Sequence, residues 1–220
     1  SYFLRANYKL KDRYLISVSS RIDGSSRFGA DNRYGFFPAA SVGWILSEEA
    51  FLQNVSAVSF LKLRLSYGIT GNSEIEDFDA LGLYEGSNYA GVSGMRPLSV
   101  ASPDLRWETT NQTDIGIDFG FVNNRITGEF DYYIKKTTDL LLDVNVPATS
   151  GFVSVLKNVG KLENKGFEFV INTHNLVGKL KWTTSFNIAH NVNKITDLDG
   201  QILTAGDFNR AMEGEPIGIF

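Results

Sequence analysis

The sequence predicts an all-β protein: an antiparallel transmembrane β-barrel, of which this chain forms a part of about eight strands. Three observations favour this class. Apolar residues recur at alternate positions, charged residues keep to the intervening positions, and short links alternate with long ones. Because a strand turns successive side chains to opposite faces, this period indicates strands with one apolar and one polar face.

The composition excludes several other classes. The 220 residues carry a net charge of −4, without the basic excess of a nucleic-acid-binding protein, so we expect no nucleic-acid partner. Cysteine is absent, which excludes disulfides and thiolate metal sites. No apolar run approaches the ~18 residues of a spanning helix, whereas a barrel strand needs only about 9–11 residues. The first residues also lack the order of a signal peptide.

Four alternating segments in the first half are predicted strands. In residues 2–10, Tyr2, Leu4 and Tyr8 occupy one phase, and Arg5 and Lys9 the other. The apolar phases of the next three are Tyr14, Ile16, Val18 and Ile22 in residues 13–22, Val42 and Trp44 in residues 36–46, and Leu61, Leu63, Leu65, Tyr67 and Ile69 in residues 59–70.

Four more alternating segments follow in the second half. Their apolar phases are Ile115, Ile117, Phe119 and Phe121 in residues 107–121, Ile126, Phe130, Tyr132 and Ile134 in residues 125–135, Phe167, Phe169 and Ile171 in residues 167–173, and Leu180, Trp182, Phe186 and Ile188 in residues 180–191. Across all eight segments, no Asp, Glu, Lys or Arg occupies the apolar phase. A lipid-facing charge near the bilayer midplane costs about 2–4 kcal/mol, so this pattern favours a membrane barrel.

Short and long links between the segments alternate along the chain. The short ones are residues 11–12, 123–124 and 175–178, and the long ones are 23–35, 71–106, 137–160 and 193 onward. Asn, Asp and Gly in the short links tolerate the positive φ of tight turns. Outer-membrane barrels have short periplasmic turns and long outer loops, so we expect all long links on one side.

Aromatic residues recur near the ends of the predicted strands. They are Tyr14, Phe36, Phe37, Trp44, Tyr67, Trp107, Phe119, Phe121 and Trp182. Interface girdles of a membrane barrel account for them. In a soluble β-sandwich, the alternative fold, the same residues are core.

The chain offers little for catalysis. His174 and His190 are isolated, and no motif of a nucleophile, phosphate loop or metal site occurs in a suitable context, so we expect no enzyme activity, no catalytic residue, no metal and no cofactor. In the long 71–106 link, Tyr84, Asn88 and Tyr89 are candidates for substrate binding, because Tyr rings stack on sugars or peptides and amides donate hydrogen bonds.

Eight stretches resemble the SusC/RagA family of TonB-dependent outer-membrane transporters and occur in the order of that family. They include RIDGSSRFG at 21–29, LKLRLSYGITGN at 61–72 and PDLRWETT at 103–110. The others are residues 32–39, 43–49, 131–141, 164–168 and 213–218. Together they span nearly the whole chain.

The resemblance implies the late part of a barrel of about 22 strands with a plugged lumen in the outer membrane of a Gram-negative bacterium. It implies energy from TonB and a SusD-like surface lipoprotein, which together import a glycan or an oligopeptide. We expect residues 1–220 to belong to the barrel domain, with the plug domain, the TonB box and the final strands absent, so that the chain is a fragment.

The charges of the polar phase are predicted to face the lumen, dock the plug and wet the translocation path. They are Arg5, Lys62, Arg64, Asp114, Asp118, Glu129 and Asp131. The alternative function is a soluble or surface-exposed β-sandwich that binds glycan, or acts as an adhesin, without transport. The orientation of Leu61, Leu63 and Leu65 discriminates between the two, because a sandwich buries them in protein.

Overall fold

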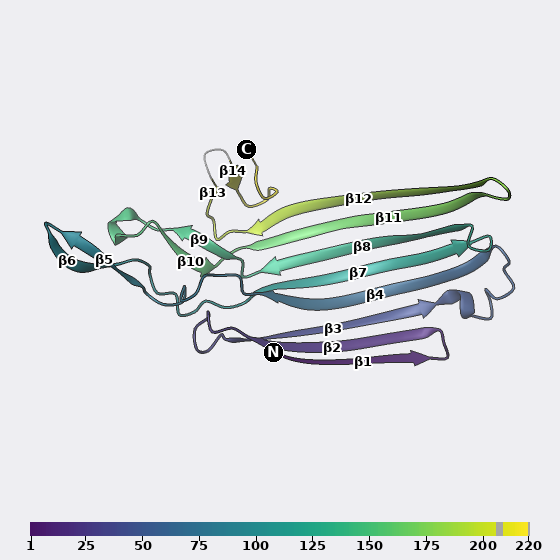
Figure 1. Ribbon diagram of the computed structural model, residues 1–220, viewed down its shortest axis with the longest axis horizontal. Helices are drawn as coiled ribbons and strands as arrows, with labels where there is room; N and C mark the ends of the chain where they lie inside the picture. Colours follow the sequence, from purple (N-terminus) through teal and green to yellow (C-terminus); the bar gives the residue numbers. More distant parts are fainter. Residues whose placement is uncertain (206–208, 220) are drawn as a thin grey trace.

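The computed structural model describes residues 1–205 and 209–219. Eight strands form one antiparallel sheet whose strand order follows the chain (Figure 1). They are β1 (Tyr2–Leu10), β2 (Tyr14–Gly24), β3 (Tyr34–Ile45), β4 (Val58–Asn72), β7 (Glu108–Phe121), β8 (Ile126–Thr138), β11 (Lys161–Val177) and β12 (Lys181–Asp197). The arrangement is an up-and-down meander in a single layer, and no second sheet covers either face within the described residues.

All eight predicted strands are confirmed, and the structure extends six of them beyond the predicted limits, three of them with charged residues on the outward phase. β8 continues to Thr138, β11 begins at Lys161, and β12 continues to Asp197. These extensions carry lysines and a glutamate onto the phase that is apolar elsewhere. The prediction of a charge-free apolar phase therefore holds only within the predicted limits of the strands.

The short links and the long links lie at opposite ends of the sheet, as predicted (Figure 1). Lys11 and Asp12 have φ of 50° and 57°, and residues 122–124 also have positive φ. The third short link lies at residues 178–180 rather than 175–178, because β11 extends to Val177. The link after β3 contains the 3₁₀ turn η1 (Leu46–Glu48).

The opposite end carries three small hairpins that the sequence pattern did not predict. They are formed by β5 (Tyr84–Tyr89) with β6 (Val92–Pro97), β9 (Leu141–Asn145) with β10 (Ser154–Asn158), and β13 (Leu203–Ala205) with β14 (Asn209–Ala211). A second 3₁₀ turn, η2 (Ala148–Ser150), joins β9 to β10. Within the described residues, no helix is long and apolar enough to cross a membrane.

The register places the two phases of the sequence on the two faces of the sheet. One continuous row across the strands consists of Tyr8, Ile16, Val42, Leu65, Ile115, Tyr132, Phe167 and His190. The row one residue away consists of Lys9, Leu15, Gly43, Arg64, Gly116, Asp131, Glu168 and Ala189. Because directly paired residues point to the same face, the first row lies on the apolar face and the second on the polar face.

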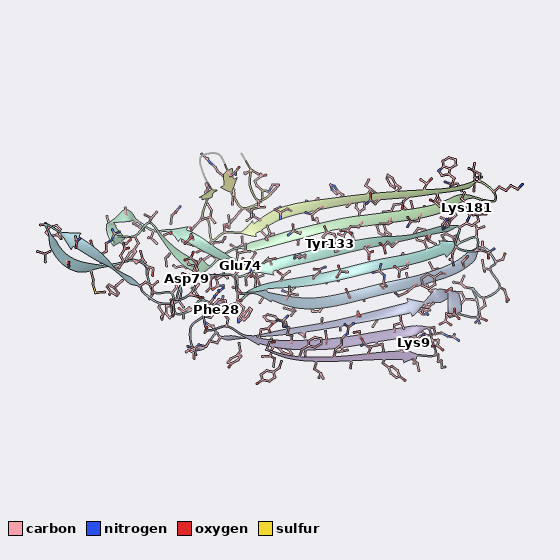
Figure 2. The ribbon with its side chains drawn as sticks, viewed as in Figure 1. Lys9, Phe28, Glu74, Asp79, Tyr133 and Lys181 are labelled. Atoms are coloured by element: carbon pink, nitrogen blue, oxygen red, sulfur yellow. The ribbon has the colours of Figure 1, made fainter. Side chains whose placement is uncertain are left out.

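The buried core lies among the long links rather than on the sheet. Phe28, Ile75, Ala80 and Leu105 form a cluster, which we call the loop core. Trp107, Leu141 and Leu156 pack against it. Figure 2 shows Phe28 at this end of the molecule, near Glu74 and Asp79, whereas Lys9 and Lys181 lie at the short-turn end.

Two of the predicted girdle residues belong to this region instead. The Trp107 ring lies 5.4 Å from Phe28 and 5.3 Å from Phe37, measured between ring centroids. Phe37 occupies the polar phase of β3 and is buried, with its ring against Trp107 and close to Gly35 and Gly71. For Phe37 and Trp107 the girdle prediction was therefore wrong: these two rings anchor the loops to the polar face.

Candidate functional site

The polar face carries a connected network of charges at mid-sheet. Lys62 Nζ donates to Asp118 Oδ2 at 3.2 Å, and Arg64 Nε donates to Asp118 Oδ1 at 2.8 Å. Arg64 Nη2 also donates to Asp131 Oδ2 at 3.0 Å. Four of the seven predicted luminal residues thus form one ion network across β4, β7 and β8.

Gly116 makes the bridge between Arg64 and Asp131 possible. It lies between Arg64 and Asp131 in the register, so the guanidinium passes over it to reach the carboxylate. A Cβ at this position would lie 2.8 Å from the Arg64 guanidinium carbon and would also overlap the Asp131 carboxylate. The bridge therefore requires a residue without a side chain on β7.

The other three predicted luminal charges have different surroundings. Asp114 accepts hydrogen bonds from Ser66 Oγ at 3.0 Å and Gln112 Nε2 at 2.8 Å. Glu129 pairs with Asp118 in the register and borders the same concavity. Arg5 lies away from the network on the outermost strand β1, where its Nε donates to Asn7 at 3.2 Å.

The network lines a concavity of about 840 Å³ on the polar face. Its wall includes neutral polar residues that the sequence analysis did not single out, among them Tyr133, Asn164 and Asn191. Tyr133 OH donates to Asn191 Oδ1 at 3.0 Å, and Figure 2 shows Tyr133 at the middle of the sheet. Their shared phase with the charged residues was the signal that could have found them.

The three candidate substrate residues lie far from this network, on the β5–β6 hairpin that projects beyond the loop core (Figure 1). Tyr84 and Asn88 occupy the same phase of β5, whereas Tyr89 occupies the other. The side chains of Tyr84 and Tyr89 are 66% and 87% exposed. The structure therefore brings Tyr84 and Asn88 to one face of the hairpin and places Tyr89 on the opposite face.

No metal site emerges from the part of the chain that the structure describes. It contains no group of three or more His, Asp or Glu side chains arranged to hold an ion. In the acidic link after β4, Asp77 pairs with Arg27 Nε at 2.9 Å, and Asp79 accepts a hydrogen bond from the Glu76 backbone at 2.8 Å. Asp77 and Asp79 thus stabilise the conformation of the link itself.

A second polar cluster lies at the short-turn end, around Glu49. Its carboxylate accepts hydrogen bonds from Tyr14 OH at 2.7 Å, Trp44 Nε1 at 3.0 Å and Arg13 Nη1 at 2.7 Å. The hydroxyl of Tyr14, followed by the indole of Trp44 and the Arg13 guanidinium, lowers the pKa of Glu49 from its ordinary value. The stacked rings of Tyr14 and Trp44 thus direct their polar tips to the end of the sheet, which is the orientation of interfacial aromatics.

A single sheet with one apolar face, one polar face and all long links at one end is the wall of an outer-membrane β-barrel. A match to a family model over nearly the whole chain supports this class. The model described as TonB dependent receptor-like, beta-barrel matches residues 1–216, and the chain belongs to this family.

The relatives agree with the family assignment. The chain is 46% identical over 211 residues to the TonB-dependent receptor SusC of Bacteroides thetaiotaomicron, which covers 91% of the chain and 21% of SusC. It is 41% identical over 237 aligned residues to the TonB-dependent receptor P26 of Formosa agariphila, which covers all of the chain and 24% of P26.

Similar solved structures also support the family assignment. The structure of the RagAB peptide importer in the closed-closed state matches with a TM-score of 0.90 and 33% sequence identity, over 98% of this chain and 24% of that chain. The open-open state of the same importer matches with a TM-score of 0.89. The chain thus spans 21–24% of the length of these relatives.

These findings confirm the SusC/RagA-like resemblance and the outer-membrane location. The family is one of TonB-dependent receptors rather than of enzymes, in agreement with the expectation for this chain. The β-sandwich alternative was wrong, because Leu61, Leu63 and Leu65 lie on the face of a single-layer sheet and no opposing sheet buries them within the described residues.

Proposed function

We propose that the protein containing this chain imports a glycan or an oligopeptide across the outer membrane, using energy from TonB and a SusD-like surface lipoprotein. In this proposal residues 1–220 form part of the barrel wall, and the plug that TonB pulls belongs to the remainder of a longer protein. The likeness to the RagAB peptide importer supports an oligopeptide as one cargo class.

The charge network of the polar face is the observation that carries the proposal. Lys62, Arg64, Asp118 and Asp131 are bound to one another in the middle of a face whose reverse side is apolar. Charges in that position face the lumen, where they bind the plug and keep the path wet. Glu129 and Glu168 border the same concavity without an ion pair in the described residues, so the docked surface of the plug is expected to supply basic groups.

Uptake by the full-length protein tests this role. We expect Arg64→Glu to reduce uptake of a labelled oligopeptide or glycan by about tenfold, which corresponds to ~1.4 kcal/mol of lost docking energy. The charge reversal leaves Asp118 and Asp131 without their shared cation. Uptake is measured in cells with matched amounts of assembled barrel.

Lys179→Glu is the matched control, because it reverses a charge in the short turn between β11 and β12, away from the concavity. It should transport like the wild type, and deletion of TonB should abolish uptake in both. If Arg64→Glu transports as well as Lys179→Glu, the network has no part in docking, even if TonB-dependent import itself is retained.

A further inference from the structure

The apolar face ends in a group of lysines at the loop end of β8, β11 and β12. Lys136, Lys165 and Lys194 occupy the same phase as Phe130, Phe167 and Ile188 and therefore point away from the lumen. We call these three residues the lysine patch. They lie on neighbouring strands, because Lys136 and Lys194 both pair with Glu163 in the register, and Lys165 is the next outward residue along β11.

The positive charge of this patch is only partly neutralised. Glu163 lies 3.6 Å from Lys136 Nζ and 3.8 Å from Lys165 Nζ, and it is the carboxylate that the two lysines share. Lys194 makes no ion pair within the described residues. The adjoining Lys161 is already matched by Asp197 at 2.8 Å. The patch therefore carries three positive charges against one negative charge.

The height of the patch follows from the length of the apolar band below it. On β8 the outward positions from Ile126 to Ile134 carry no charge, a length of roughly 27 Å at ~3.4 Å per residue. A strand tilt of about 40° reduces this to roughly 21 Å along the membrane normal, close to the ~25 Å band of outer-membrane barrels. Lys136 is the next outward residue, so the patch lies at the level of the lipid headgroups.

We propose that Lys136, Lys165 and Lys194 form a binding site for the phosphate groups of a phosphorylated lipid of the outer leaflet. Ammonium groups on flexible stems form charge-assisted hydrogen bonds with phosphate oxygens at the headgroup level. The apolar residues directly below, among them Tyr132 and Phe167, contact the acyl chains of the same lipid. The site lies on the outer surface of the wall and is thus separate from the import path.

Binding of two matched lipids by the full-length protein tests this site. The probes are bis-phosphorylated lipid A and its dephosphorylated form, which have identical acyl chains, each presented in phosphatidylcholine nanodiscs. We expect the wild type to retain the phosphorylated lipid about tenfold better, and we expect Lys136→Gln/Lys165→Gln/Lys194→Gln to lose this preference. Native mass spectrometry counts the bound lipid.

Lys135→Gln is the matched control, because it removes the same charge from the adjacent residue of β8, whose side chain faces the lumen. It should keep the preference of the wild type, and inorganic phosphate at the same concentration should not displace the lipid. The proposal is overturned if the wild type does not distinguish the two lipids, if the triple variant retains the preference, or if Lys135→Gln loses it equally.

Discussion

Gly116 illustrates how one residue determines the geometry of the ion network. Its neighbours Arg64 and Asp131 lie on the two strands flanking β7, so their side chains meet only by crossing the position of a missing Cβ. Glycine is poorly suited to a strand interior because it weakens packing and has high conformational entropy when unfolded. A close approach of side chains from both sides gives it a reason to be there.

We predict that Gly116→Ala opens the Arg64–Asp131 bridge and lowers the free energy of unfolding of the full-length protein by about 1 kcal/mol, as for a partly exposed ion pair. The three atoms nearest to the added methyl belong to the side chains of Asp131 and Arg64, whose ends it displaces. Urea unfolding followed by the gel mobility of unheated samples measures the change.

Gly86→Ala serves as its control, since nothing lies within 4 Å of a Cβ at that position. A double-mutant cycle with Asp131→Asn locates the effect: once the carboxylate is neutral, Gly116→Ala should cost little more. An equal cost in both backgrounds would show that the methyl acts on something other than the bridge.

Glu49 gives the short-turn end a dependence on pH. Its folded pKa is lowered by the hydroxyl of Tyr14, the indole of Trp44 and the guanidinium of Arg13, whereas its ordinary value is 4.5. A carboxyl with a lowered folded pKa contributes stability that is fully present above its unfolded pKa and is lost as the pH falls through the folded pKa.

We therefore predict that Glu49→Gln lowers the Tm of the full-length protein at pH 7 and that the difference from the wild type shrinks below about pH 4.5. The variant keeps the shape of the side chain but not its charge. Thermal scans at a series of pH values measure the difference, and Glu48→Gln, on the neighbouring residue, controls for the general effect of removing an acid. A difference that stays constant from pH 7 to pH 3 would contradict the assignment.

At the scale of the element, the long strands were predictable and the small hairpins were not. The long strands repeat the period of two over many residues because each faces two unlike environments. The β5–β6 hairpin has a turn at Ala90 and Gly91, with φ of 48° and 83°. Alanine is not a residue that signals such a turn, and both arms of the hairpin are exposed on most positions, so no alternation marks them.

The limits of β11 were missed for a related reason. Its first residues, from Lys161 to Gly166, alternate with lysine and glutamate on the outward phase, which reads from sequence as a polar link. Only the pairing with β8 and β12 shows that this segment continues the strand. The lysine patch was invisible in the sequence because the predicted strands stopped just before it.

The β5–β6 and β9–β10 hairpins differ in how they are attached to the rest of the chain. Each hairpin pairs only with itself within the described residues, but the β9–β10 hairpin also packs against the loop core through Leu141 and Leu156. Ser102 Oγ donates to the Leu156 carbonyl at 2.8 Å, and Asn158 Nδ2 donates to the Arg106 carbonyl at 2.7 Å. The first hairpin is therefore a projection and the second is part of the packing.

We predict that replacing residues 84–97 by a short Gly-Ser linker leaves the Tm of the full-length protein within about 2 °C of the wild type, because this hairpin buries little apolar surface. Replacing residues 141–158 in the same way should lower it by more, since Leu141 and Leu156 leave the loop core. Differential scanning calorimetry measures both. Equal Tm values for the two replacements would show that the β9–β10 hairpin does not stabilise the loop core.

At the scale of the whole molecule, the eight-stranded sheet has one face suited to lipid and one suited to water. Its fold needs no sheet-on-sheet core, because in an outer-membrane barrel lipid covers the apolar face and the polar face lines the lumen. The sequence predicted this division and four members of the ion network, since charge and phase are visible in the chain. It did not predict Tyr133, Asn164 and Asn191, because their phase places them on the polar face but their residue types, which occur on either face of a strand, do not mark a site.

Adjacent residues of β3 provide the sharpest test of this division. Val42 lies in the apolar row and Ser41 one residue away on the polar face. We predict that Val42→Arg makes folding into lipid vesicles less favourable by about 2 kcal/mol, a cost between those of a cation near the interface and at the midplane of the lipid face. Ser41→Arg adds the same charge to a wet surface and should change it by less than about 1 kcal/mol. Urea titrations of the full-length protein refolded into vesicles measure both values. Because the two substitutions differ by one position in the chain, equal costs would mean that the register of the wall, and with it the assignment of every luminal and lipid-facing residue, is shifted.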